Sequence, residues 1–182
     1  MNSQELKKEM NMSYETLTKY LQQKYGIPMK PYFRTPTCKS KSPISRTKEG
    51  LYCHHIQETE LDNLSDTGKA LSAPWQWQLP ENLCYCNYLE HLLLHILINE
   101  KRCKFHECFV EDGIIHFMIP ELNKIYKDKP VYTASNQLWR NFIIKEIENN
   151  YEEYCELIRF WLGKIEQYNF YWTYKQLINI II

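Results

Sequence analysis

Apolar side chains recur at helical spacing at the beginning of the chain and again in its last third. Residues 3–25 carry leucine, methionine and tyrosine side chains three or four positions apart, which predicts an amphipathic helix. Ser13 is a favourable N-cap residue, so we expect a break near Asn11 and a second helix start. Residues 136–149 and 150–167 show the same spacing and are also predicted to be helical.

Shorter apolar runs lie between these helical regions and predict strands. Residues 51–56 form one strand-like run and residues 83–86 form another, and a long loop separates them. Residues 105–110 and 114–119 flank the turn sequence Glu-Asp-Gly, which predicts a β-hairpin. Helices and strands are therefore expected in one chain of the α+β class.

The helix expected after the second run begins with a recognisable cap and carries two histidines. Asn87 is a favourable N-cap residue, and Glu90 follows at the position that completes a capping box. His91 and His95 then lie four positions apart on one helix face. At this spacing two imidazoles from successive turns can bind a single metal ion. Leucine and isoleucine cover most of the remaining surface, so two imidazoles in this helix require polar partners.

Further chemistry-bearing residues accompany this helix. The dipeptide His54-His55 lies in the first strand-like run, and Asn82 immediately precedes the second run, nine positions before His91. Together with His95, this order of strand, loop, strand and helix resembles the HNH nuclease motif, the ββα-metal fold of the nuclease colicins. The chain departs from the family's pattern in its long loop and in its lack of paired CxxC zinc knuckles.

The resemblance covers roughly residues 50–98 and implies a small ββα-metal core. We expect this core at residues 50–100, an N-terminal helix and basic arm at residues 1–49, and a β-hairpin with a helical C-terminal extension at residues 101–182. The helices and the hairpin would pack around the core. The apolar residues 170–182 would be buried in the fold or against a second copy, so a homodimer is an expectation.

The same resemblance implies a role for each histidine. His54, His91 and His95 would bind one divalent ion. His55 would be the neutral general base, and Asn82 would hydrogen-bond across the base of the loop and fix the geometry of His55. The implied activity is metal-dependent hydrolysis of phosphodiester bonds. Three imidazoles suit zinc, nickel, manganese or cobalt better than magnesium, although the family also uses magnesium. Because the ion needs neutral imidazoles, activity should fall in acid.

Basic charge gathers just before the first strand, although the net charge of the whole chain is zero. Residues 30–48 include lysine and arginine but no acidic residue, and their proline and serine content predicts an extended arm or loop. Lysine and arginine neutralise the phosphates of nucleic acid, so the arm is a candidate binding surface. We expect a nucleic-acid partner, DNA in preference to RNA. The residues expected to contact phosphate are Lys39, Lys41, Arg46 and Lys48.

Two other functions fit the same residues. The chain could be a catalytically silent HNH-like module that binds nucleic acid or a protein partner without cutting. It could instead be a structural zinc protein, in which a cysteine such as Cys53 joins His54, His91 and His95 in a four-ligand site. A Cys-His-Cys group at residues 103–108 lacks a recognisable second half for zinc.

Cysteine use and hydropathy indicate the compartment. The seven cysteines are an odd number, and their positions do not suggest a disulfide scaffold, so reduced thiols are expected. No apolar run reaches the roughly 20 residues that span a bilayer. The polar N-terminus does not resemble a signal peptide. We therefore expect a cytoplasmic protein without a membrane partner.

Overall fold

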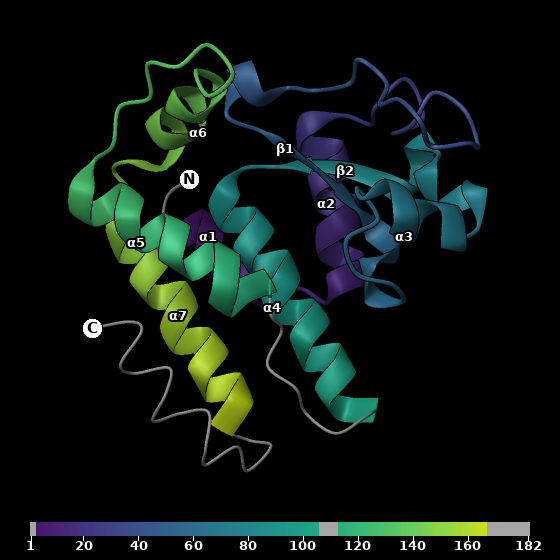
Figure 1. The fold of residues 1–182 in the computed structure, drawn as a ribbon. Helices are drawn as coiled ribbons and strands as arrows, with labels where there is room; N and C mark the ends of the chain where they lie inside the picture. The colour runs from purple at the N-terminus through teal and green to yellow at the C-terminus, as the bar shows by residue number, and fades with distance from the viewer. Residues whose placement is uncertain (1–2, 106–112, 167–182) are drawn as a thin grey trace.

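The computed structural model describes residues 3–105 and 113–166, and it places helices around a two-stranded antiparallel sheet (Figure 1). This arrangement confirms the expected α+β class. The side chains of the Cys-His-Cys group and the apolar residues 170–182 lie outside the described residues, and with them the surface expected for a homodimer. No helix in the described part combines the length and the apolar character that a membrane span needs.

The N-terminal region forms two helices separated by a short break, as its sequence predicts. Helix α1 spans Ser3–Met10 and helix α2 spans Tyr14–Tyr25. Ser13 is the N-cap of α2, and its hydroxyl accepts a hydrogen bond from the Thr16 amide at 3.2 Å. Both helices pack through apolar faces, whose fully buried side chains include Leu6, Leu17 and Leu21.

The two strands bring the histidine-bearing segments together. Strand β1 spans Tyr52–His55 and strand β2 spans Leu83–Cys86, so both predicted strands are confirmed. Their antiparallel register pairs His54 with Cys84. Helix α4 (Tyr88–Phe105) begins two residues after the end of β2 and therefore starts beside β1 (Figure 1). This short strand-to-helix connection sets the position of the candidate site.

The loop between the strands is ordered by short helices and by a small buried core. Phe33, Cys38 and Ala70 form a buried cluster, against which Tyr32 and Trp75 pack. The basic arm is consequently folded onto the loop. The elements of this region are η1 (Thr47–Glu49) before β1, then η2 (Ile56–Thr59), α3 (Thr67–Ser72), η3 (Trp75–Gln78) and η4 (Pro80–Asn82).

The β-hairpin predicted at residues 105–119 is wrong for its second strand, because residues 114–119 are helical. A π-helical turn, η5 (Gly113–Met118), leads directly into helix α5 (Ile119–Asp128). Burial in this region follows a helical period, which a run of β-branched and aromatic residues concealed in the sequence. The buried residues include Ile114, Met118, Leu122 and Ile125. Most of the first predicted strand lies outside the described residues.

Helix α4 lies at the centre of the described fold. The two helices predicted near the C-terminus are confirmed as α6 (Trp139–Ile147) and α7 (Tyr151–Glu166). Helices α5 and α7 lie on one side of α4, whereas α2 and the sheet lie on the other (Figure 1). The buried side chains of α4 include Leu89, Leu92, Leu93 and Ile96. Because α4 is packed on several sides, the direction of its polar side chains is fixed.

Candidate metal centre

The capping arrangement that the sequence predicts fixes the start of α4. The Asn87 side chain accepts hydrogen bonds from the amides of Leu89 and Glu90, both at 2.9 Å. Glu90 Oε2 in turn accepts a hydrogen bond from the Asn87 amide at 2.7 Å. This buried capping box determines which residues of the next turn face the sheet. His91 and His95 consequently lie on the side of α4 that faces His54 of β1.

Three imidazoles meet between β1 and α4. His54, His91 and His95 each offer one nitrogen, and these nitrogens lie within 4.8 Å of one another. The ring centroids of His91 and His95 are 4.7 Å apart. The ring centroid of His54 lies 5.3 Å from that of His91 and 5.5 Å from that of His95. Within residues 3–105 and 113–166 this is the one group of three or more residues whose ligand atoms converge in this way. The structure therefore brings together the three residues expected to bind metal.

Tyr14 of α2 determines which nitrogen of His54 can bind an ion. The Tyr14 hydroxyl donates a hydrogen bond to the carbonyl of Ile56 at 2.9 Å, and it lies 2.9 Å from His54 Nε2. Because that hydroxyl hydrogen is used on Ile56, His54 Nε2 must donate to the hydroxyl oxygen. The lone pair of His54 is then on Nδ1, which is buried and has no hydrogen-bond partner. A partner on one ring nitrogen orients the other in this way in many metal sites.

Burial keeps His54 and His91 neutral. Removal from water lowers the pKa of His54 and of His91 well below the usual range, and the neighbouring imidazoles lower it further. The Nδ1 atom of His91 is also buried without a hydrogen-bond partner, whereas the atom of His91 that faces His95 is Nε2. If Nε2 binds an ion, Nδ1 carries the hydrogen of the neutral ring. An unsatisfied buried polar group costs about 1–3 kcal/mol. Neutral imidazoles with free lone pairs are the form in which histidine binds metal ions.

The spacing of the ligand atoms fits an ion of the zinc class. Two ligand atoms about 2.1 Å from a tetrahedral ion lie about 3.4 Å apart. The Nε2 atoms of His91 and His95 are 3.2 Å apart, within hydrogen-bond distance when no ion is bound and also close to this value. Nitrogen ligands favour zinc, nickel or cobalt over magnesium, which prefers oxygen. The residues present therefore fit a divalent transition-metal ion, and the identity of that ion remains a proposal.

His55 is not part of this group, although its Nδ1 lies 4.0 Å from Glu58, which also faces His54. Gln78 donates through Nε2 to the Leu64 carbonyl at 3.2 Å, so its Oε1 is the atom that lies 2.9 Å from His55 Nε2. His55 Nε2 therefore carries the hydrogen, and Nδ1 carries the lone pair. Tyr32 covers the ring at a centroid distance of 4.5 Å. Burial lowers the pKa of His55 to about 4, so the ring is neutral at pH 7.

Asn82 closes the base of the loop between the strands. Its Oδ1 accepts a hydrogen bond from Gln57 Nε2 at 3.1 Å, and its Nδ2 donates to the Gln76 carbonyl at 2.8 Å. These contacts join the first residues of the loop to its last. Asn82 precedes Leu83, which pairs with His55 in the sheet. The His55 side chain, however, donates its hydrogen bond to Gln78 and not to Asn82.

The residues expected to contact nucleic acid differ in their surroundings. Lys39, Lys41 and Lys48 are exposed. Lys41 donates a hydrogen bond to the Tyr32 hydroxyl at 2.9 Å. Arg46 is half-buried, pairs with Glu49 and donates to the Tyr25 carbonyl, so its guanidinium is already used within the fold. The three lysines are therefore better placed than Arg46 to meet a phosphate.

Glu58 is the site residue that reasoning from the sequence missed. It lies in η2, four residues after His54, and its carboxylate is buried next to the imidazoles. The sequence shows it only as one member of an acidic run at residues 57–66. Its position four residues after a candidate ligand is the signal that could have indicated it. Cys53, the cysteine considered as a fourth ligand, is not among the converging ligand residues, and burial raises its pKa to about 12.

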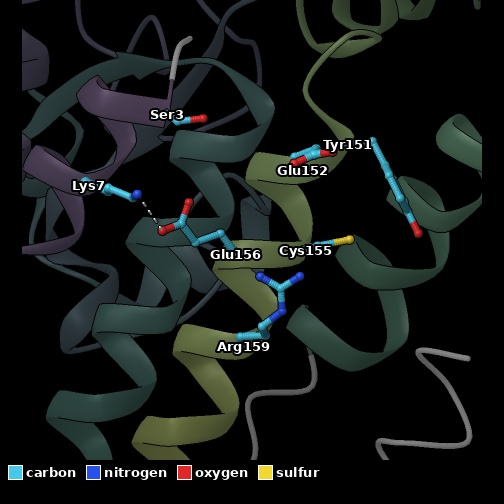
Figure 2. A pocket seen from close by; sticks show the side chains of 7 residues that line it. All are labelled: Ser3, Lys7, Tyr151, Glu152, Cys155, Glu156 and Arg159. Carbon is cyan, nitrogen blue, oxygen red and sulfur yellow. Dashed lines mark ion pairs between the residues drawn. The ribbon is translucent and has the colours of Figure 1, made fainter.

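A surface hollow of about 330 Å³ lies elsewhere, between α1 and α7 (Figure 2). Lys7, Glu156 and Arg159 line it together with Cys155, and Lys7 pairs with Glu156 at 4.0 Å. Figure 2 shows charged side chains of both signs around this hollow. None of the residues expected to bind metal or nucleic acid lines it.

Comparison with protein-family models, with curated proteins and with solved structures finds no match to this chain. The resemblance to the HNH nucleases therefore rests only on the histidines, on Asn82 and on their arrangement.

Proposed function

We propose that this protein is a metal-dependent nuclease of the ββα-metal type, which hydrolyses phosphodiester bonds in nucleic acid. The observation that carries the proposal is the convergence of His54 from β1 with His91 and His95 from α4. The order of the elements supports it, because an antiparallel pair of strands leads directly into the helix that carries the two histidines. DNA is the proposed substrate in preference to RNA, as the resemblance implies.

A bound divalent ion would polarise a phosphate oxygen and neutralise the charge that develops on the leaving oxygen. His54, His91 and His95 would hold it through neutral nitrogens. Tyr14 keeps the lone pair of His54 on the correct nitrogen by accepting a hydrogen bond from the other. The capping box of α4 keeps the two helical histidines in register with β1.

His55 is the proposed general base. Its Nδ1 carries the lone pair, because Nε2 donates to Gln78. The ring is neutral at pH 7, as a base must be before it accepts a proton from water. A phosphate bound nearby would raise its pKa toward the working pH, because a negative charge favours the protonated imidazole. The proposed role of Asn82 is to fix this geometry by closing the base of the loop that carries Gln78.

Lysines of the arm are the proposed contacts to the phosphate backbone. Lys39 and Lys41 lie in the segment that packs on the loop between the strands, and Lys48 lies in η1, just before β1. All three are exposed, so a phosphate can approach them without unfolding the arm. Such contacts would position the nucleic acid without reading its sequence.

A cleavage assay with defined metal content tests the proposal. Protein freed of metal and then loaded with zinc, nickel, manganese or magnesium is incubated with supercoiled plasmid and with single-stranded RNA. We expect cleavage of the plasmid that depends on the ion. His55→Ala should bind metal as the wild type does but cut at least about 100-fold more slowly. His116→Ala is the matched control, because His116 is exposed on η5.

Two results would contradict the proposal in different ways. Equal cleavage by His55→Ala would remove His55 from the role of base while leaving the nuclease function intact. Failure of the metal-loaded wild type to cut either nucleic acid with any of the four ions would reject the nuclease function itself.

A structural metal site is the second candidate function, and the burial of the histidines favours it. His54 and His55 are each 1 % exposed, as expected for groups that hold a fold together. Structural sites contribute folding free energy directly, so removal of the ion should lower the free energy of unfolding. A chain that loses its cooperative unfolding transition without metal, and that never cuts nucleic acid, belongs to this second class.

A further inference from the structure

Glu58 places a carboxylate next to the imidazole group from a third element of the fold. It lies in η2, directly after β1, whereas His91 and His95 come from α4. Its Oε2 is 3.6 Å from His54 Nδ1 and 3.7 Å from His95 Nε2. The carboxylate is largely buried, with 10 % of the side chain exposed. A buried carboxylate needs a cation or hydrogen-bond donors to offset its desolvation.

The two carboxylate oxygens of Glu58 have different surroundings. Oε1 accepts a hydrogen bond from the Leu64 amide at 3.2 Å. The backbone at this position is held as well, because Arg102 of α4 donates to the Glu58 carbonyl at 2.6 Å. These contacts leave Oε2 directed at the imidazoles. The carboxylate is therefore oriented by protein groups before any ion arrives, which is typical of a ligand with supporting contacts.

The distances from Oε2 match ligand-to-ligand distances better than hydrogen bonds. A separation of 3.6 Å or 3.7 Å between nitrogen and oxygen is too long for a direct hydrogen bond. Two ligand atoms of one tetrahedral ion, by contrast, lie about 3.4 Å apart. The separation of 3.2 Å between the Nε2 atoms of His91 and His95 belongs to the same range. The distances from Oε2 to His54 and His95 thus fit two edges of one coordination shell. Glu58 does not belong to the group of ligand atoms that all lie within 4.8 Å of one another, so its carboxylate would move inward when an ion binds.

We propose that Glu58 is the fourth protein ligand and closes a three-histidine, one-glutamate site for an ion of the zinc class. The inference rests on the proposed function in one respect, because both require an ion at the imidazoles. Its chemical consequence is specific. The carboxylate would lower the net charge of the ion and its ligands from +2 to +1, whereas the neutral imidazoles would leave that charge unchanged. Because zinc sites of this kind can expand to five ligands, a phosphate oxygen would enter as the fifth ligand.

Metal affinity and cobalt spectroscopy test Glu58 on the full chain. Zinc affinity is measured by competition with a chromophoric chelator for the wild type, Glu58→Gln, His95→Ala and Glu60→Gln. Glu60 is an exposed carboxylate two residues away and serves as the matched control. We expect Glu58→Gln to bind zinc at least about 10-fold more weakly and Glu60→Gln to bind as the wild type does. The d–d absorption of bound cobalt(II), which is strongest in tetrahedral sites, should weaken in Glu58→Gln.

The possible results separate the failure of this inference from the failure of the proposed function. Glu58→Gln with unchanged affinity and an unchanged cobalt spectrum, while His95→Ala binds weakly, would overturn the role of Glu58 and leave the metal site standing. A wild type that binds no ion would overturn the metal site and the nuclease together. If Glu58→Gln does not fold, a crystal structure of the zinc-bound wild type decides the question. Glu58 then lies within about 2.2 Å of the ion, or the inference is wrong.

Discussion

A half-buried lysine faces three carboxylates between α1, α2 and α4, and this imbalance makes stability depend on pH. Lys24 Nζ lies 2.5 Å from Glu5, 3.3 Å from Glu9 and 2.7 Å from Glu90. One ammonium cannot offset three negative charges, and the Glu9 side chain is fully buried. Glu9 Oε2 also lacks a hydrogen-bond partner. Burial, followed by the charge of Glu90, raises the pKa of Glu9 from 4.5 to about 7.

The sign and size of the effect follow from this pKa. Between pH 4.5 and pH 7 the unfolded chain has released the Glu9 proton, whereas the folded chain retains it. Stability therefore falls as the pH rises through this range. Each pKa unit corresponds to about 1.4 kcal/mol, so the full loss above pH 7 is about 3 kcal/mol. Glu9→Gln is neutral at every pH and should escape this loss.

Urea unfolding followed by tryptophan fluorescence measures the difference between the two proteins. We expect Glu9→Gln and the wild type to be similar near pH 4.5, and the variant to be more stable by up to about 3 kcal/mol at pH 8. The buried histidines titrate in both proteins and therefore cancel in the difference. Glu81→Gln, at an exposed site, should show a difference that does not change with pH. A difference for Glu9→Gln that is equally flat would refute the reasoning.

Three further substitutions test other contacts. Tyr14→Phe removes the acceptor of the His54 Nε2 hydrogen and should weaken zinc binding about 10-fold in a competition titration, with an unchanged circular dichroism spectrum. Gly50→Ala adds a Cβ at a φ of 75° and 2.6 Å from Glu146 Cβ, so thermal unfolding should show a loss of about 1–3 kcal/mol. Asn99→Leu removes the acceptor that lies 3.0 Å from Trp161 Nε1 and should cost about 1–3 kcal/mol in urea unfolding. Unchanged zinc affinity in the first case, or unchanged stability in the others, would show that the contact contributes little.

Local features of the site could be predicted from the sequence because they depend on residues close together in the chain. The capping box of Asn87 and Glu90 joins positions three apart, and His91 and His95 share a face through helical geometry alone. The strand before the long loop was also predictable from its short apolar run. The expectation that His54 would meet the helical pair came from the resemblance, since no local rule joins segments so far apart.

Other parts could not be predicted because they depend on tertiary packing. Tyr14 reaches His54 from α2, and Gln78 reaches His55 from η3, and neither contact leaves a periodic signal in the sequence. Glu58 was concealed in an acidic run that resembled a solvated loop. The hairpin prediction failed at Ile114 because β-branched residues favour strands locally, whereas burial against α4 favours a helical turn.

The connection between His54 and α4 gives a bound ion a mechanical effect on the molecule. Between His54 in β1 and His91 in α4 the chain passes through η2, α3, η3, η4 and β2, and the two histidines then lie side by side. An ion bound by both residues would tether the two ends of this segment, as a covalent cross-link would. It would reduce the conformational freedom of the unfolded chain. The loop within this segment packs on only a small apolar cluster. Loss of the ion should therefore loosen this whole flank of the protein before it loosens the helices on the opposite side of α4.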